Sequence, residues 1–355
     1  MNVRASLASL TLSIMLAACS QPSVPSTSVS GNPTSSANVI GSLATAPLPA
    51  VQVTVTRSAD PEIPETELTL IEKAHFVSHT FSNGETVDWE NRSGYIVRDG
   101  DVLVMKSSDL RQRLVAYETK LKKERAATLS TQSLVVVPTS SCGFFSCSTR
   151  DVRWKSVGII PYSFDPSLPF NKVVAITTAI DDWNNTSTAF GTPIKWQQVY
   201  NASNRVQFTA ETDAGACGSS FIGMQGGVQP LKIGDGGCLT TGVLEHEMLH
   251  AAGVEHEQQR CDRDTFITVI ADQYIRPERR SQFAKYCDVA HQTKTNFDYE
   301  SLMLYGPTRE YSVSGTTPVI SVPVFAPSGS DGAPSRFGQR DGFSFDDING
   351  LRQYY

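Results

Sequence analysis

The chain has 355 residues, which is enough for one or two domains. Its formal net charge of -6 at pH 7 argues against nucleic acid as the natural partner. No apolar run reaches the roughly 18 residues of a membrane-spanning helix, so the processed chain is not expected to cross a membrane.

Residues 1–19 are typical of an export signal that ends at a cysteine. An apolar stretch over residues 5–18 leads into Leu16-Ala17-Ala18-Cys19, which resembles the lipobox of bacterial lipoproteins. This resemblance implies that Cys19 is lipid-modified and becomes the first residue, and that its acyl chains are the sole contact with a membrane. Ser20, in place of aspartate, indicates the outer membrane if the cell has one. The alternative is an ordinary cleaved signal followed by an unrelated cysteine.

Two segments separate this signal from the main domain, which we expect over residues 148–355. Residues 20–60 are rich in Ser, Thr, Pro, Val and Ala and almost uncharged, which predicts a flexible tether. In the segment 61–147, residues 96–104 predict two short strands about a turn. Residues 108–125 predict a charged helix with apolar spacing. The pair His75 and His79 lacks a neighbouring glutamate and a third ligand, so we assign no metal site to it.

The main domain begins with an alternation of strands and a helix. Ile159–Phe164 predicts a strand, and the apolar spacing over Asn171–Trp183 predicts a packed helix. Ile194–Val199 and Arg205–Thr209 predict further strands. The expected order is therefore strand, helix, strands, a second helix that carries histidines, and then irregular chain.

That second helix contains the most informative stretch of the sequence. Residues 246–256 read His-Glu-Met-Leu-His-Ala-Ala-Gly-Val-Glu-His, the pattern H-E-x-x-H-x-x-G-x-x-H. Positions i and i+4 lie on one face of an α-helix, so His246 and His250 can point at one metal ion. Gly253 is placed to end the helix, because glycine tolerates the left-handed conformation of a C-terminal cap. The chain can then reverse and bring His256 to the same ion.

Three imidazoles suit one catalytic zinc ion. Such an ion keeps its fourth position for water and lowers the pKa of that water to about 7. Glu247 follows the first ligand and is the predicted general base. The alternative is a helix that carries histidines by chance, and the fixed offsets of Gly253 and His256 argue against it.

The sequence continues as Glu257-Gln258-Gln259-Arg260-Cys261-Asp262-Arg263-Asp264. With it, the chain resembles the astacin family of metzincin metalloproteases, whose extended motif is H-E-x-x-H-x-x-G-x-x-H-E-x-x-R-x-D-R-D. The similarity runs from about residue 153 to the end. It implies an α+β fold with a mixed sheet plus helices in the upper half and a largely irregular lower half. It also implies a zinc metalloendopeptidase, with the zinc in a cleft between the halves and with protein or peptide substrates.

The resemblance assigns roles to residues outside the histidine motif. Asp298-Tyr299-Glu300-Ser301-Leu302-Met303-Leu304-Tyr305 resembles the turn that metzincins place beneath the metal. Met303 would be the methionine of that turn. Tyr305 would be the tyrosine that ligates the resting metal and swings away to stabilise the transition state. Leu304 replaces the usual histidine of the family, which is not a ligand. Residues 218–223 resemble the edge strand that pairs with extended substrate.

Astacins are made as proenzymes, so the resemblance identifies residues 61–147 as a pro-segment and residues 148–355 as the catalytic domain. The family motif of the pro-segment is F-x-G-D, and its aspartate occupies the zinc. Arg98-Asp99-Gly100-Asp101 matches only the G-D part, with Arg98 in place of the phenylalanine. Asp101 is therefore the implied latency ligand. The alternative is that this Gly-Asp pair only forms a turn.

Activation would need a protease that cuts between the pro-segment and the catalytic domain. Lys122-Lys123-Glu124-Arg125 and a position near Ser148 are candidate sites. Either cut would release the catalytic part from its lipid anchor. The resemblance further implies that the new N-terminus is buried near Glu257.

Seven cysteines fit an exported protein that forms disulfides. Without Cys19, six remain, and many pairings are open. The resemblance favours Cys217–Cys238, because Cys238 lies just ahead of the zinc helix. We predict Cys261–Cys287 and Cys142–Cys147 for the others. A zinc site made of cysteines is the alternative, and it lacks a C-x-x-C pair.

These inferences predict an exported zinc-dependent endopeptidase, made as a latent precursor and anchored at the bacterial cell envelope as a lipoprotein. Two alternatives stay open. The first is a non-catalytic surface binding protein with a structural zinc, although a structural site needs neither Glu247 nor Tyr305. The second is a zinc amidase that acts on cell-wall peptides, although the similarity on both sides of the zinc motif favours the endopeptidase.

Overall fold

The computed structural model describes residues 53–55, 65–130, 144, 152–154, 158–213, 215–269, 282–287, 295–306, 308–311, 320–323, 325–327 and 337–355. The predictions for Cys19 and for the Cys142–Cys147 bridge lie outside these residues. In the described part, no helix combines the length and the apolar character that crossing a membrane requires. The predicted domain boundaries stay predictions.

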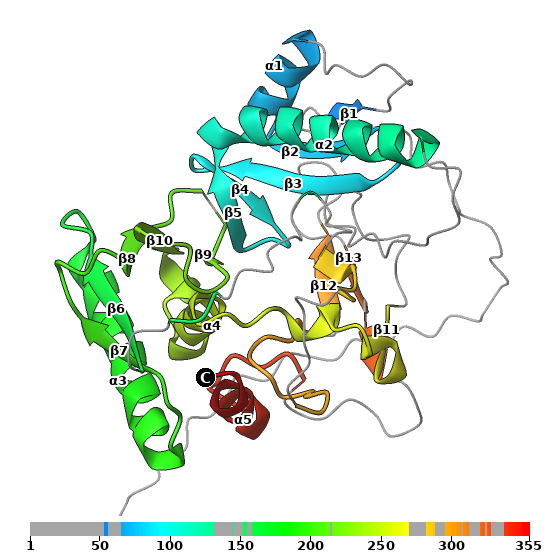
Figure 1. Ribbon diagram of the computed structural model, residues 1–355. Helices are drawn as coiled ribbons and strands as arrows, with labels where there is room; N and C mark the ends of the chain where they lie inside the picture. The colour runs from blue at the N-terminus through cyan, green and yellow to red at the C-terminus, as the bar shows by residue number, and fades with distance from the viewer. Residues whose placement is uncertain are drawn as a thin grey trace, which may run out of the picture. The chain divides into compact units, whose positions relative to one another are not determined.

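The described residues from Val53 to Phe144 contain a sheet covered by helices (Figure 1). We call them the pro-segment after the role predicted for residues 61–147, and we call the described residues from 152 onward the catalytic domain after the role predicted for residues 148–355. The elements of the pro-segment are β1 (Val53–Val55), α1 (Glu65–Lys73), β2 (Phe76–Thr80), β3 (Thr86–Arg92), β4 (Tyr95–Arg98), β5 (Val102–Lys106), the 3-10 turn η1 (Ser107–Asp109) and α2 (Leu110–Ser130). The two predicted strands about a turn are confirmed as β4 and β5. We had expected a flexible tether over residues 20–60. Instead, residues 53–55 form strand β1, which pairs with β2 of the sheet.

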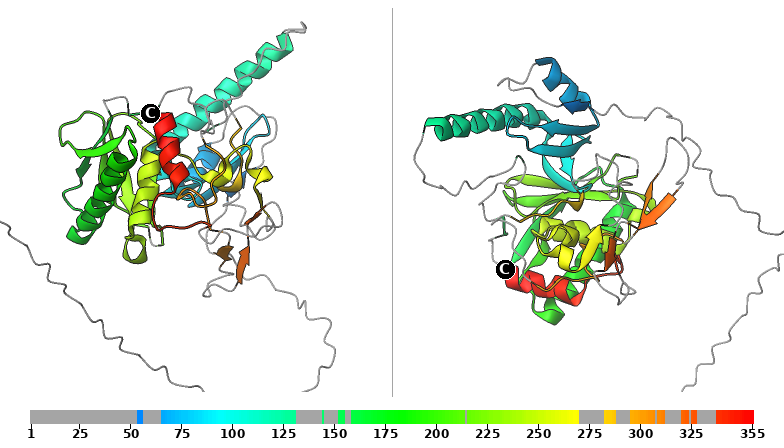
Figure 2. Two further views of the ribbon diagram at one scale, coloured as in Figure 1. Left: turned by 90° about the horizontal axis from the view of Figure 1, so that it is seen from below. Right: turned by 90° about the vertical axis from the view of Figure 1, so that its right-hand side faces the viewer.

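Helix α2 is longer than the predicted helix and is drawn in teal in both views of Figure 2. It continues to Ser130, so the candidate cleavage site at residues 122–125 lies inside a helix. Proteins commonly bind a peptide as an extended strand. A protease that does so could reach this stretch only after the helix had locally unfolded.

An apolar core holds the pro-segment together. It is formed by buried residues of its helices and strands and by one residue from further along the chain: Leu68, Ile71, Ala74, Val77, Phe81, Trp89, Ile96, Leu110, Leu114, Tyr117 and Phe144. Phe144 is fully buried, and its amide donates to the Glu85 carboxylate over 3.1 Å. The ring of His79 packs edge-on against Phe81, at 4.5 Å between centroids, which supports a structural role for this histidine.

The catalytic domain follows the predicted order and adds elements to it. Its elements are β6 (Ile159–Phe164), α3 (Phe170–Phe190), β7 (Lys195–Gln198), β8 (Arg205–Ala210), β9 (Gly218–Phe221), β10 (Val228–Ile233), η2 (Gly236–Cys238), α4 (Thr241–Ala251), η3 (Glu257–Gln259), η4 (Arg263–Thr265), β11 (Ile267–Val269), β12 (Thr308–Tyr311), β13 (Ile320–Pro323), β14 (Phe325–Pro327) and α5 (Phe345–Tyr354). The predicted strands are confirmed, and α3 extends beyond the predicted helix. Strand β10 was not predicted; Pro230 within it is unusual for an inner strand.

One mixed sheet contains strands of both parts, in the order β1-β2-β3-β4-β5-β9-β10-β8-β6-β7. Strand β5 of the pro-segment pairs in parallel with β9, with Val102 opposite Ser220 and Leu103 opposite Phe221. Strand β9 is therefore an inner strand here and not the open edge we had expected. The pro-segment occupies the edge that the resemblance assigns to substrate.

The core of the catalytic domain lies between its sheet and helices α3 and α4. Trp183 of α3, Phe208 of β8 and Met248 of α4 are among its buried members. The later part of the chain adds a few short elements to the predicted irregular half. It contains two small antiparallel sheets, β11 with β14 and β12 with β13, as well as α5.

Candidate metal centre

Helix α4 presents the first two histidines of the motif. The Thr240 side chain caps its first turn by accepting a bond from the Val243 amide over 3.4 Å. The helix ends at Ala251, and Gly253 follows with φ +104° while its amide donates to the His250 carbonyl over 2.8 Å. A Cβ at Gly253 would also lie 2.8 Å from the Tyr354 ring. Glycine thus ends the helix where the sequence predicted.

The reversal of the chain brings the three histidines together. The ring centroids of His246, His250 and His256 lie 4.7–5.3 Å apart, and all three side chains are buried. Each Nδ1 donates to an oxygen: His246 to Leu302 O at 2.8 Å, His250 to Val254 O at 2.8 Å and His256 to Gln259 Oε1 at 3.2 Å. These bonds leave every Nε2 as the atom that can bind a metal.

Asp101 of the pro-segment completes the cluster. Its carboxylate oxygens lie 3.4 Å from His246 Nε2, 3.7 Å from His250 Nε2 and 3.3 Å from His256 Nε2. Four ligands about 2.0 Å from a tetrahedral ion are separated by roughly 3.3 Å, so this donor set has the dimensions of a zinc site. Within the described part of the chain, Nε2 of His250 and of His256 makes no hydrogen bond. The residues present therefore fit one zinc ion.

His246 is also in the protonation state that a metal requires. Burial, together with the charge of Arg340, lowers the pKa of His246 to about 3. A neutral imidazole keeps the lone pair with which it binds the ion. Arg340 itself is oriented by its bond from Nη1 to the Leu304 carbonyl, at 3.0 Å.

Glu247 lies beside this cluster under strand β9. Its side chain is almost completely buried. Burial and the negative charge of Asp101 raise the pKa of Glu247 well above its usual range. A Cβ at Gly218 would lie only 2.7–2.8 Å from the Glu247 side chain, so the glycine makes room for this carboxylate.

The segment that resembles the metzincin turn lies against the same cluster. Met303 is buried in the core, and its carbonyl accepts a bond from the Glu257 amide over 3.0 Å. The ring of Tyr305 packs 4.7 Å from that of His256. Its hydroxyl donates to the Asp99 carbonyl over 2.5 Å. The tyrosine thus binds the pro-segment main chain, while Asp101 supplies a carboxylate as the fourth donor beside the three histidine nitrogens.

A family comparison can be set against this geometry. A family model described as Astacin, a peptidase family, matches residues 146–355, more than half of the chain. The chain belongs to the astacin family. Its α+β fold, a mixed sheet with helices, is the one expected for this family. The family is zinc-dependent, in agreement with the donor set at the histidines.

Individual members of the astacin family match part of this chain. It is 30% identical to an "Astacin-like metalloendopeptidase" of Coturnix japonica over 230 residues, which are 62% of this chain and 50% of that protein. It is 39% identical to "Zinc metalloproteinase nas-4" of Caenorhabditis elegans over 137 residues, 38% of this chain and 40% of that protein. The chain thus spans about half the length of the curated relatives it matches. High choriolytic enzyme 1 of Oryzias latipes, a hatching enzyme zinc-protease of known structure, is 28% identical, with a TM-score of 0.48 over 59% of this chain and 96% of that one.

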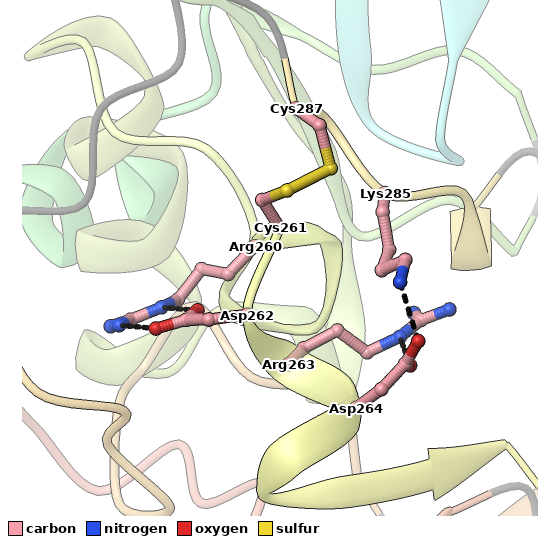
Figure 3. Close-up of a disulfide and its surroundings, with 7 residues drawn as sticks. All are labelled: Arg260, Cys261, Asp262, Arg263, Asp264, Lys285 and Cys287. Carbon is pink, nitrogen blue, oxygen red and sulfur yellow. Dashed lines mark hydrogen bonds and ion pairs between the residues drawn. A yellow bond between two sulfur atoms is a disulfide. The ribbon is translucent and has the colours of Figure 1, made fainter.

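The astacin signature beyond the third histidine stabilises the loop that follows it. Arg260 forms a two-pronged ion pair with Asp262, and Arg263 pairs with Asp264, which also accepts from Lys285 (Figure 3). The predicted bridges Cys217–Cys238 and Cys261–Cys287 are both confirmed, with Cα atoms 4.9 and 4.8 Å apart. The second bridge fastens residues 282–287 to the ligand loop.

Glu257, the expected partner of a new N-terminus, already has partners within the catalytic domain. Its Oε1 accepts from Arg260 Nη1 at 2.8 Å and from the Asp298 amide at 2.9 Å. Burial, opposed by the charge of Arg260, raises the pKa of Glu257 to about 7. Its role toward an N-terminus stays a prediction.

Sequence reasoning missed several residues around the metal centre. Asp347 of α5 holds the Met303 turn by accepting from the Leu302 amide over 3.0 Å. Glu255 and Tyr286 contact Arg98 of the pro-segment. Local spacing could not predict the contacts of Arg98, because Glu255 and Tyr286 lie far away along the chain. The departure of Arg98 from the family motif was the one sign in the sequence that this position is unusual.

Proposed function

We propose that the protein is a zinc-dependent endopeptidase that hydrolyses peptide bonds in proteins and is made as a latent precursor. The observation that carries this proposal is the convergence of three histidine Nε2 atoms beside the buried carboxylate of Glu247. A structural zinc site would not need such a carboxylate. Membership of the astacin family supports the same activity.

His246, His250 and His256 would hold the ion. When bound, zinc supplies a Lewis acid that polarises the scissile carbonyl and makes water more acidic. The Glu247 carboxylate would take the proton of the attacking water and pass it to the leaving amine. Tyr305 would donate a hydrogen bond to the oxygen on which negative charge develops, as its hydroxyl does to a peptide carbonyl in this structure.

Substrate would bind along β9. In the precursor this strand pairs with β5 through backbone contacts, including the bond from the Ser220 amide to the Asp101 carbonyl at 2.9 Å. Once β5 leaves, the same backbone groups can pair with an extended peptide. Such main-chain pairing is independent of substrate sequence and suits an enzyme that acts on unfolded proteins.

The activity is tested with the activated full chain and its Glu247→Gln variant on an unfolded protein, with zinc content measured in both. Cleavage by the parent alone, with zinc in both, is the expected result. The exposed carboxylate of Asp181 on α3 provides the control, since Asp181→Asn should cleave like the parent. Zinc in both proteins without cleavage by the parent would contradict the proposal and favour a non-catalytic binding protein.

Latency would come from Asp101. Its carboxylate lies 3.3–3.7 Å from all three Nε2 atoms, where it would take the position that water needs. The same residue is fixed by the β5–β9 pairing and by the turn before it, so the block is held by main-chain bonds as well as by charge.

Latency is tested on the uncleaved chain. The variant Asp101→Ala should gain peptidase activity, because it removes the carboxylate without touching the catalytic domain. Asp109→Ala, at an exposed carboxylate of η1, should stay inactive. If Asp101→Ala remains as inactive as the parent even on peptides too short to need β9, Asp101 is not the latency ligand.

Export, anchoring and activation belong to the same proposal. The lipobox-like sequence at Cys19 supports a lipoprotein of the bacterial cell envelope, whose catalytic part is released after an activating protease has cut. Incorporation of labelled fatty acid into the parent but not into Cys19→Ser would support the anchor. Labelling of both, or an active form that stays at the membrane after cleavage, would count against this part.

A further inference from the structure

We propose that Glu255 and Tyr286 form a subsite for a cationic side chain of the substrate, and that Arg98 of the pro-segment occupies this subsite in the precursor. The inference rests on the proposed peptidase function and gives it a substrate preference. Peptides with arginine or lysine close to the cleaved bond would be preferred.

The contacts of Arg98 define the subsite. Its Nη2 donates to Glu255 Oε1 over 2.6 Å, and its Nη1 donates to the Tyr286 hydroxyl over 2.5 Å. The guanidinium carbon also lies 4.9 Å from the centroid of the Tyr286 ring. A carboxylate, a phenol oxygen and an aromatic face together are the groups that recognise a guanidinium or an ammonium. The Arg98 side chain is only 11% exposed, so these contacts are largely shielded from water.

A tight turn places Arg98 close to the metal cluster. Asp99 and Gly100 both have positive φ, at 58° and 93°, and Arg98 is paired with Val102 across the hairpin. The loop between these paired residues therefore consists of Asp99, Gly100 and Asp101, so Arg98 ends β4 only three residues before Asp101. Because Asp101 reaches the three histidines, the partners of Arg98 must also lie near the reacting centre. Glu255 directly precedes the ligand His256.

Both partners of Arg98 are fixed by the catalytic domain itself. The Tyr286 amide donates to the Gln259 carbonyl over 2.8 Å, and Tyr286 precedes Cys287 of the bridge drawn in Figure 3. Glu255 lies in the loop between α4 and the third histidine. Asp99, which also pairs with Arg98, belongs to the pro-segment and leaves with it. The Glu255 carboxylate and the Tyr286 phenol therefore remain in the catalytic domain, and a cationic side chain of the substrate can replace Arg98.

The charge and burial of Arg98 support this complementarity. A buried guanidinium needs a partner of opposite charge, and Glu255 is that partner in the catalytic domain. A pro-segment that occupies a substrate site is expected to carry a side chain suited to that site.

The test uses the full chain with a cleavage site for a highly specific protease inserted between Ser130 and Phe144, cut there and then separated from the released pro-segment. Arginine is placed in turn at each position around one cleavable bond, and citrulline, its neutral analogue, replaces it in the matched peptide. At one position kcat/KM should favour arginine about 10- to 100-fold, as charge-assisted bonds predict. The preference should disappear in Glu255→Gln, and Glu255→Arg should favour glutamate at that position.

Asp181→Asn serves as the matched control and should keep the preference of the parent. Equal rates for arginine and citrulline at every position, or a preference that survives Glu255→Gln, would overturn the proposal. The Arg98 contacts would then only hold the pro-segment in place. If the cut parent cleaves no peptide, the result contradicts the proposed peptidase function and leaves the subsite to a separate measurement. The subsite is then read from binding of the labelled arginine and citrulline peptides to the cut chain, and equal affinities would overturn it.

Discussion

At the scale of single residues, the position of Glu247 depends on a glycine in the neighbouring strand. Gly218 begins β9, and a Cβ there would meet Cγ, Cδ and Oε1 of Glu247 at 2.7–2.8 Å. Separations this short force one of the two groups to move. The carboxylate is the flexible partner and would be displaced from its place beside the histidines.

We therefore expect Gly218→Ala to lower kcat/KM of the activated enzyme about 100-fold, as a catalytic group moved by about 1 Å would. The zinc content should not change, because no ligand touches Gly218. Steady-state kinetics with zinc analysis measures both. Gly237→Ala is the control, since a Cβ at Gly237 has no neighbour within 4 Å. Parent-like kinetics of Gly218→Ala would show that Glu247 does not need this space.

Single residues also show how much of the site could be predicted from the sequence. The three ligands and Glu247 could be predicted because their spacing is local, on one helix and the loop after it. Gly218 could not be recognised as important, since nothing in the sequence relates it to a helix that begins more than 20 residues later. The same holds for Arg98 and Glu255, whose ion pair joins the pro-segment to the ligand loop.

At the scale of elements, helix α5 holds the turn that contains Met303. Ser344 and Asp347 form a capping box at its start. The Asp347 carboxylate also accepts from Ser301 Oγ at 2.6 Å and from the Leu302 amide at 3.0 Å. The Leu302 carbonyl in turn accepts from His246 Nδ1. The cap of the last helix therefore orients a metal ligand.

Asp347→Ala should weaken zinc binding about 10- to 100-fold, the usual effect of losing a group that orients a ligand. It should also lower Tm, because three donors lose their acceptor. Competition with a chelator and thermal unfolding measure the two effects. Asp346→Ala, at the adjacent position of the same helix turn, should change neither by a comparable amount. Unchanged zinc affinity in Asp347→Ala would mean that the cap of α5 does not orient His246.

At the scale of the whole molecule, the described strands of the pro-segment and of the catalytic domain form one sheet through the pairing of β5 with β9, beside which Val97, Leu103 and Phe221 form a small apolar cluster. The pro-segment has its own apolar core, and the catalytic domain has another. The junction can therefore open while each core persists. Opening would expose one row of backbone groups on β9 and remove Asp101 from the histidines.

Hydrogen exchange measured by mass spectrometry should detect this opening. Amides of β9, among them that of Ser220, should exchange slowly in the precursor and faster once the pro-segment has been cut off and has left. Strand β8, which lies between β10 and β6, is the internal control and should keep its protection. Equal protection of β9 before and after release would mean that another segment covers this strand, and the route proposed for substrate would be wrong.

From the sequence by itself we predicted the three histidines that converge in the structure, the two confirmed disulfides and the strands and helices nearest the histidines, together with Glu247 as general base. These features rest on local spacing, such as i and i+4 on a helix, or on a motif of fixed length. Only the tertiary structure decided that β9 is covered by β5, that Gly218 makes room for Glu247 and that Arg98 lies on Glu255 and Tyr286. Such contacts join residues far apart along the chain, and their register depends on packing and chain closure rather than on any local pattern.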